Sequence, residues 1–176
     1  MDSAQAYGYM LYFVSLMTMG GIYAIMCLGL NIQWGFTGLF NAGIAGFFAI
    51  GAYVSAILTT AESASHLGGY DLPIALGLVG AMAVTAVIAW LVGLLCIRLR
   101  SDYLAIATIG IGEIFRLILK NEIWATNGAR GIAKIPLPFE TLSEPWNKIG
   151  FMLLVLAVVA LFYFVIERAR LAPWGR

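Results

Sequence analysis

The chain has 176 residues, of which 62% are hydrophobic and 11% are charged, and its formal net charge at pH 7 is +1. A water-soluble domain of this length could not bury so much apolar surface, so the composition predicts an integral membrane protein surrounded by lipid. The near-neutral charge excludes the basic surface that nucleic-acid binding requires.

The chain opens with a long uncharged stretch, because no Asp, Glu, Lys or Arg occurs from residue 3 to residue 61. Crossing the hydrocarbon core of a bilayer takes about 20 apolar residues. This stretch therefore predicts two transmembrane helices, over residues 7–30 and 38–60.

Three further apolar blocks, residues 73–97, 103–119 and 149–166, predict three more transmembrane helices. Helices are favoured over barrel strands because each block is continuously apolar, whereas a barrel strand alternates between apolar and polar residues over about 10 positions. The predicted fold is all-α, with about five transmembrane helices in a single domain over residues 1–176.

The connections predict an orientation in the membrane. Residues 121–148 contain three prolines and mixed charge, which is typical of a loop outside the membrane. Alternation places this extracytoplasmic loop opposite five arginines near the ends of spans, and the positive-inside rule then puts the arginines in the cytoplasm and the N-terminus outside. The five are Arg98, Arg100, Arg168, Arg170 and Arg176; Arg130, Lys134 and Lys148 on the opposite side weaken the bias.

Small residues recur along the second predicted helix at Gly38, Ala42, Ala45 and Ala49. Steps of four and three place them on one face, where they would let another helix approach closely. Helix packing is the favoured interpretation, and a face that lines a substrate path is the alternative. Asn41 lies just inside the same predicted helix, and an amide at membrane depth needs a partner or a watery path.

The fourth predicted helix carries two charges near its middle. If this helix begins at Asp102, a rise of about 1.5 Å per residue puts Glu113 about 16 Å into a core of ~30 Å. Arg116 lies three residues further on, so the two charges can pair on one face. The pair either borders a polar translocation path or fixes this helix to its neighbour. Gly110 and Gly112 favour a close backbone contact or a break in the helix.

Motifs for catalysis are absent from the sequence. The chain has no phosphate-binding GxxxxGK[ST] loop, no GxSxG elbow and no HExxH pair. Its single His and its two cysteines, Cys27 and Cys96, do not have metal-ligand spacing. We therefore expect no enzyme activity, no cofactor and no metal.

Five strings of the sequence together resemble the permease subunits of ABC importers for branched-chain amino acids, specifically the M-type subunit. The strings are residues 23–41, 46–53, 98–106, 112–116 and 127–132. Two features differ from that family. Many members carry a His where this chain has Ile44, and they continue beyond a segment like residues 173–176 into a coupling helix that docks on the ATPase. The chain is thus expected to match the N-terminal half of a permease.

The resemblance implies an importer in the bacterial inner membrane that passes branched-chain amino acids. Its partners would be a second permease subunit, two ATPase subunits and a periplasmic substrate-binding protein. In that scheme we expect Asn41 and Thr108 to line the substrate path, and Glu113 and Arg116 to hold the helix bundle together. The alternatives are an inactive structural fragment and a permease for urea, amides or other amino acids.

Overall fold

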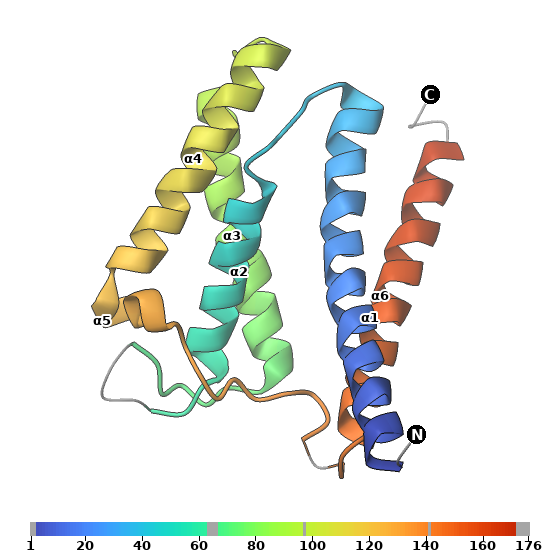
Figure 1. The fold of residues 1–176 in the computed structure, drawn as a ribbon. Helices are drawn as coiled ribbons and strands as arrows, with labels where there is room; N and C mark the ends of the chain where they lie inside the picture. The colour runs from blue at the N-terminus through green and yellow to red at the C-terminus, as the bar shows by residue number, and fades with distance from the viewer. Residues whose placement is uncertain (1–2, 63–66, 97, 141, 172–176) are drawn as a thin grey trace. The chain divides into compact units, whose positions relative to one another are not determined.

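The computed structural model describes residues 3–62, 67–96, 98–140 and 142–171, and these residues form helices and connections without a strand. The predicted all-α fold is confirmed. The elements in chain order are α1 (Ser3–Asn31), the π-helix η1 (Ile32–Phe36), α2 (Ile44–Thr59), α3 (Ile74–Cys96), α4 (Ser101–Asn121), α5 (Ile123–Thr126), the 3₁₀ helix η2 (Gly128–Arg130) and α6 (Trp146–Leu171) (Figure 1).

The helices belong to two compact units. One unit comprises Met1–Thr37 and Leu137–Arg176, and the other is Gly38–Pro136. In the first unit α1 and α6 run side by side in the same direction (Figure 1). The two helices approach closely at Gly21, because a Cβ atom at this position would come within 2.6 Å of Val155 Cγ1. Val14 and Val155 are the buried side chains of this unit.

In the second unit α2 packs against both α3 and α4. The contact with α3 is antiparallel: Cβ atoms at Gly77 and Gly80 would clash with side-chain atoms of Thr59 and Leu58, respectively. The contact with α4 is parallel, because Gly43, Gly46 and Phe47 meet Thr108, Gly112 and Phe115 in the same chain order. Consecutive helices α2, α3 and α4 therefore alternate in direction, as successive membrane crossings do.

Two hydrogen bonds order the part of the second unit that follows α4, one from the α2–α3 connection to α5 and one within the turn after α5. The Leu67 backbone N–H donates to the Trp124 carbonyl oxygen at 2.7 Å, and Asn127 Nδ2 donates to the Gly131 carbonyl oxygen at 2.8 Å. Asn127 and Gly131 both have positive φ, at 63° and 68°, which is why an Asn and a Gly occupy this tight turn.

The predicted helix boundaries hold well for three of the five spans. Helix α3 matches its prediction to within a residue at the N-terminal end, and its predicted last residue, Ile97, lies outside the described residues. Helices α4 and α6 contain their predicted spans and extend beyond both ends. Helix α4 is continuous through Gly110 and Gly112, so these glycines do not break it.

Two boundaries were predicted wrongly. The first helical stretch does not end at Leu30 but continues as η1 to Phe36. The second helix begins at Ile44 and not at Gly38, because residues 38–43 leave the helical conformation, with Gly38 at φ 70°. Pro173 and the rest of the C-terminal tail that the family comparison used lie outside the described residues.

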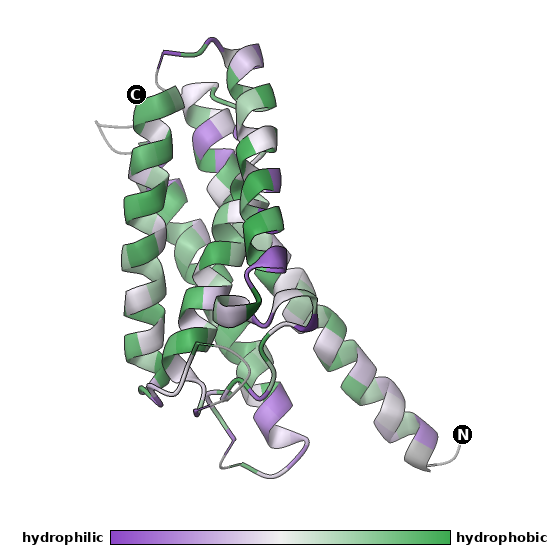
Figure 2. Cartoon of the chain, turned by 90° about the vertical axis from the view of Figure 1, so that its left-hand side faces the viewer, coloured by the Kyte–Doolittle hydropathy of each residue, from purple (hydrophilic) through white to green (hydrophobic). Residues whose placement is uncertain are grey.

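Three described stretches are long and apolar enough to cross a membrane, namely Gln5–Phe36, Ile74–Cys96 and Trp146–Leu171. Helix α2 is apolar but has only 16 residues, and α4 carries four charged side chains along 21 residues. Figure 2 shows hydrophobic residues along the helices and hydrophilic residues mainly in the connections. Crossing by α2 and α4 stays a prediction.

Candidate functional site

The candidate site is the non-helical segment that precedes α2, together with the part of α4 that supports it. Asn41 sets the local structure of this segment, since its Oδ1 atom accepts a hydrogen bond from the Gly43 backbone N–H at 3.0 Å. Such a bond from an Asn side chain to the backbone two residues on forms a turn that competes with helix. Helix α2 therefore begins only after this turn, at Ile44.

Thr108 on α4 also forms a hydrogen bond with the segment before α2. Its Oγ1 atom accepts a hydrogen bond from the Ala42 backbone N–H at 3.1 Å and donates one to the Ala105 carbonyl oxygen at 3.0 Å. Only 3% of Thr108 is exposed. The structure thus brings Asn41 and Thr108 to one place, where both satisfy backbone N–H groups of the break.

Glycines make this contact very close. A Cβ atom at Gly43 would lie 2.5 Å from the Thr108 carbonyl oxygen, and one at Gly46 would lie 2.9 Å from Gly112 Cα. Beyond them the rings of Phe47 and Phe115 meet edge to face with centroids 5.8 Å apart. Of the two predicted roles of Gly112, a close backbone contact or a helix break, the structure shows the contact.

The small residues that were predicted to share one face of a helix do not all belong to a helix. Gly38 and Ala42 precede α2, Ala45 is exposed, and Ala49 is half-buried. The close approach to α4 is made by Gly43 and Gly46, which sequence reasoning did not single out. The available signal was the three-residue spacing of these two glycines, with Gly43 directly before α2 and Gly46 in its first turn.

Glu113 and Arg116 form the expected pair within α4. Arg116 Nε donates to Glu113 Oε2 at 2.8 Å, and Arg116 Nη2 donates to Glu113 Oε1 at 2.5 Å. The side chains of Arg116 and Glu113 are 59% and 51% exposed. The residues that pack α4 on α2 are instead Thr108, Gly112 and Phe115, so within this unit the pair does not form the contact between the two helices.

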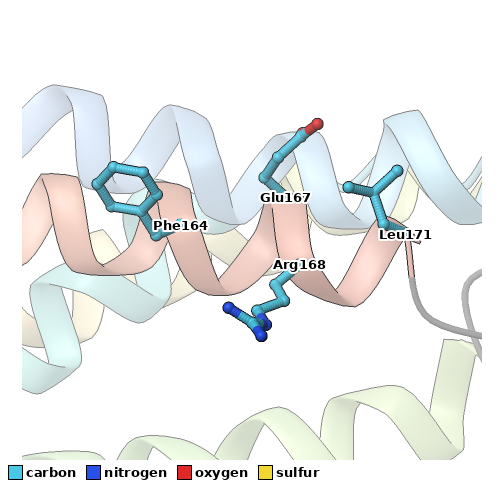
Figure 3. A pocket seen from close by; sticks show the side chains of 4 residues that line it. All are labelled: Phe164, Glu167, Arg168 and Leu171. Carbon is cyan, nitrogen blue, oxygen red and sulfur yellow. The ribbon is translucent and has the colours of Figure 1, made fainter.

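Two other hollows lined by described residues lack converging polar groups. Phe164, Glu167, Arg168 and Leu171 line an open depression on α6, where the side chains of Glu167 and Arg168 point to different sides of the helix (Figure 3). A groove of about 580 Å³ between α1 and α6 has a mostly apolar lining. Among the described residues, no cluster of His, Cys, Asp or Glu could hold a metal ion.

Comparison with known proteins gives a consistent result. Residues 12–176 match the model of a family described as the permease component of branched-chain amino acid transport systems. The high-affinity branched-chain amino acid transport system permease protein LivM of Escherichia coli K12 is 38% identical over 186 residues, which cover 93% of this chain and 42% of that protein. No solved structure matches the chain significantly.

More distant relatives have the same description. The permease protein LivH of Escherichia coli K12 is 30% identical over 129 residues, covering 70% of this chain and 41% of LivH. A probable LivM permease of Methanocaldococcus jannaschii is 27% identical over 181 residues, covering 89% of this chain and 52% of its own length. The chain thus spans about half the length of the curated relatives it matches. It belongs to the family of permease components of branched-chain amino acid transport systems.

Proposed function

We propose that the protein is a transmembrane permease subunit of an ABC importer that passes branched-chain amino acids across the bacterial inner membrane. The family and the names of its relatives support this substrate class and do not favour urea or amides. They also do not favour an inactive structural fragment. In this proposal the chain performs no chemistry, and nucleotide hydrolysis by two partner ATPase subunits drives transport.

The observation that carries the proposal is the non-helical segment of residues 38–43 before α2, which hydrogen bonds with Asn41 and Thr108 hold in place. The 16 residues of α2 extend about 24 Å, which is less than the ~30 Å of a hydrocarbon core. A crossing at α2 therefore includes part of residues 38–43. Non-helical backbone is tolerated at membrane depth only where protein buries it or a water-filled path adjoins it. We place Asn41 and Thr108 at that path, with Thr108 as the anchor of the segment.

The directions of the helices support a side of the membrane for each of the remaining partners. In the first unit α6 ends with Arg168 and Arg170, so the positive-inside rule puts this end in the cytoplasm, where the ATPase subunits would lie. Because α1 runs parallel to α6, its N-terminal end would be outside. A periplasmic binding protein would then approach residues 121–148, and a second permease subunit would complete the membrane part.

Two substitutions at Thr108 test the proposed path. Valine has nearly the same shape as threonine but leaves the partly buried Ala42 N–H without its acceptor, which costs about 1–3 kcal/mol. We expect Thr108→Val to lower leucine uptake about tenfold in cells that contain the partner subunits and no other leucine importer. Thr108→Ser keeps the hydroxyl and should transport nearly normally.

The amount of each variant in the membrane and its co-purification with the ATPase are the controls. Normal uptake by Thr108→Val would remove Thr108 from the path.

A further inference from the structure

The charged side chains of α4 are gathered on one face. At 100° per residue, all four fall within an arc of about 60° along the whole helix. They are Asp102, Glu113, Arg116 and Lys120. Ile106 and Ile109 lie within or beside the same arc and are 69% and 56% exposed. We call this the charged face of α4.

The charged face is not the face that packs on α2. The residues that contact α2, namely Thr108, Gly112 and Phe115, are centred about a third of a turn away on the helix. The charged groups are therefore presented outward from the second unit. Something polar must meet them, since an ionised side chain near the middle of a lipid-facing helix is costly.

Helix α3, which packs on α2 like α4, shows what an apolar exposed surface of this protein looks like. No charged residue occurs from Ile74 to Cys96, and its exposed side chains include Leu78, Met82 and Val87. Such a surface is compatible with lipid, whereas the charged face of α4 is not. The contrast between these two helices, which both pack on α2, points to water beside α4.

The Glu113–Arg116 pair offers both signs of charge to that water. Its two hydrogen bonds use two of the five N–H donors of the guanidinium, and each side chain is more than half exposed. A carboxylate next to a guanidinium is complementary to the ammonium and carboxylate groups that every α-amino acid carries. An overall neutral pair also imposes no net charge on a zwitterion that passes it.

We propose that the charged face of α4 lines the aqueous path and that Glu113 and Arg116 contact the ammonium and the carboxylate of the passing amino acid. This inference rests on the proposed permease function and adds a second face of α4 to the path lining, with two residues that would recognise the ammonium and carboxylate groups of the substrate. It replaces the expectation that the pair holds the bundle. The side chain of the amino acid would be recognised by residues outside the charged face of α4.

Cysteine accessibility in the natural protein, within its assembled transporter in membrane vesicles, tests the lining. Ile109→Cys and Val87→Cys form a matched pair, since both positions are 56% exposed and lie at similar distances from the short connection between α3 and α4. In a background with Cys27→Ala and Cys96→Ala, we expect a charged, membrane-impermeant methanethiosulfonate to modify Ile109→Cys at least about tenfold faster than Val87→Cys. Equal, slow rates would overturn the inference, as would a cross-link from Ile109→Cys to the second permease in place of modification.

Protection by ligands tests the role of the pair. Leucine should slow the modification of Ile109→Cys, whereas 4-methylpentanoate, which lacks the ammonium, and 3-methylbutylamine, which lacks the carboxylate, should not. Equal protection by all three compounds would show that the zwitterion is not read at α4. The two proposals fail separately: unreactive Ile109→Cys in vesicles that take up leucine rejects the lining alone, and reactive Ile109→Cys without amino acid uptake by the unsubstituted protein rejects the permease function.

Discussion

At the scale of single residues, glycines have opposite roles on the same helix. Gly112 lies against Gly43, because a Cβ atom on Gly112 would be 3.2 Å from Gly43 Cα. Gly110, two residues earlier, has no atom within 4 Å of a Cβ built on it. The sequence presents the two positions as equivalent small residues. Only the partner helix distinguishes a glycine that permits close packing from one that does not contact its neighbours.

Alanine substitutions should separate these two roles. Gly43→Ala would push a methyl group to 2.5 Å from the Thr108 backbone oxygen, which moves only if α4 moves. We expect a loss of about 1–3 kcal/mol in the free energy of unfolding, as for other overpacked sites. Gly110→Ala fills open space inside a helix and should gain up to about 1 kcal/mol. Thermal unfolding of the purified variants in detergent, followed by tryptophan fluorescence, measures both, and a similar shift for the two would contradict the packing at Gly43.

Thr85 on α3 provides a second test at the residue scale. Within the described part of the chain, its Oγ1 atom is a buried side-chain oxygen without a hydrogen-bond partner, and it faces Gly51 of α2. Replacing an unsatisfied hydroxyl by a methyl group of the same shape removes a desolvation cost. Thr85→Val should therefore unfold at the same temperature as the unsubstituted protein or at a higher one. A clear fall in that temperature would show that the hydroxyl has a partner in the membrane.

At the scale of elements, hydrophobic runs predicted the existence of the long helices, because α1, α3 and α6 are apolar almost throughout. The start of α2 could not be predicted in the same way. Gly38 and Ala42 have the four-residue spacing of one helix face, but this spacing in the sequence does not show whether the chain is helical there. The break depends on the Asn41 turn and on Thr108, which lies 66 residues away from Ala42 along the chain. A contact over such a distance leaves no local pattern.

The contact between α1 and α6 is an element-scale prediction that a double-mutant cycle can test. Gly21→Ala would bring a methyl group within 2.6 Å of Val155 Cγ1 and should lower the free energy of unfolding. Val155→Ala removes that atom, so the second change should cost less in the Gly21→Ala background than alone, with a coupling energy of about 0.5–3 kcal/mol. Gly20→Ala, at a position with no atom within 4 Å, is the control. Simple additivity would mean that the two helices do not meet at these residues.

At the scale of the whole molecule, the directions of the helices constrain the number of crossings. Helices α1 and α6 are parallel, so an odd number of crossings must separate them in any membrane arrangement in which both span. Helices α2, α3 and α4 alternate in direction and supply three. Of these three helices, only α3 is long and apolar enough by itself to cross a membrane. The number of crossings therefore depends on whether α4 crosses with its charges and α2 with the non-helical segment before it.

Labelling from the two sides of the membrane tests this arrangement and its orientation together. We expect single cysteines at Leu67 and Trp146 to react with an impermeant maleimide in intact spheroplasts, because Leu67 precedes α3 and Trp146 begins α6, and both helices run inward. Cysteines at Leu99 and Leu171 should react only after permeabilisation, since they lie beside the arginines that the positive-inside rule keeps in the cytoplasm. A complete reversal would keep five crossings and reject the orientation. Labelling of Leu67 and Leu99 from the same side would mean that α3 does not span, and the parallel pair of α1 and α6 would then need a different crossing between them.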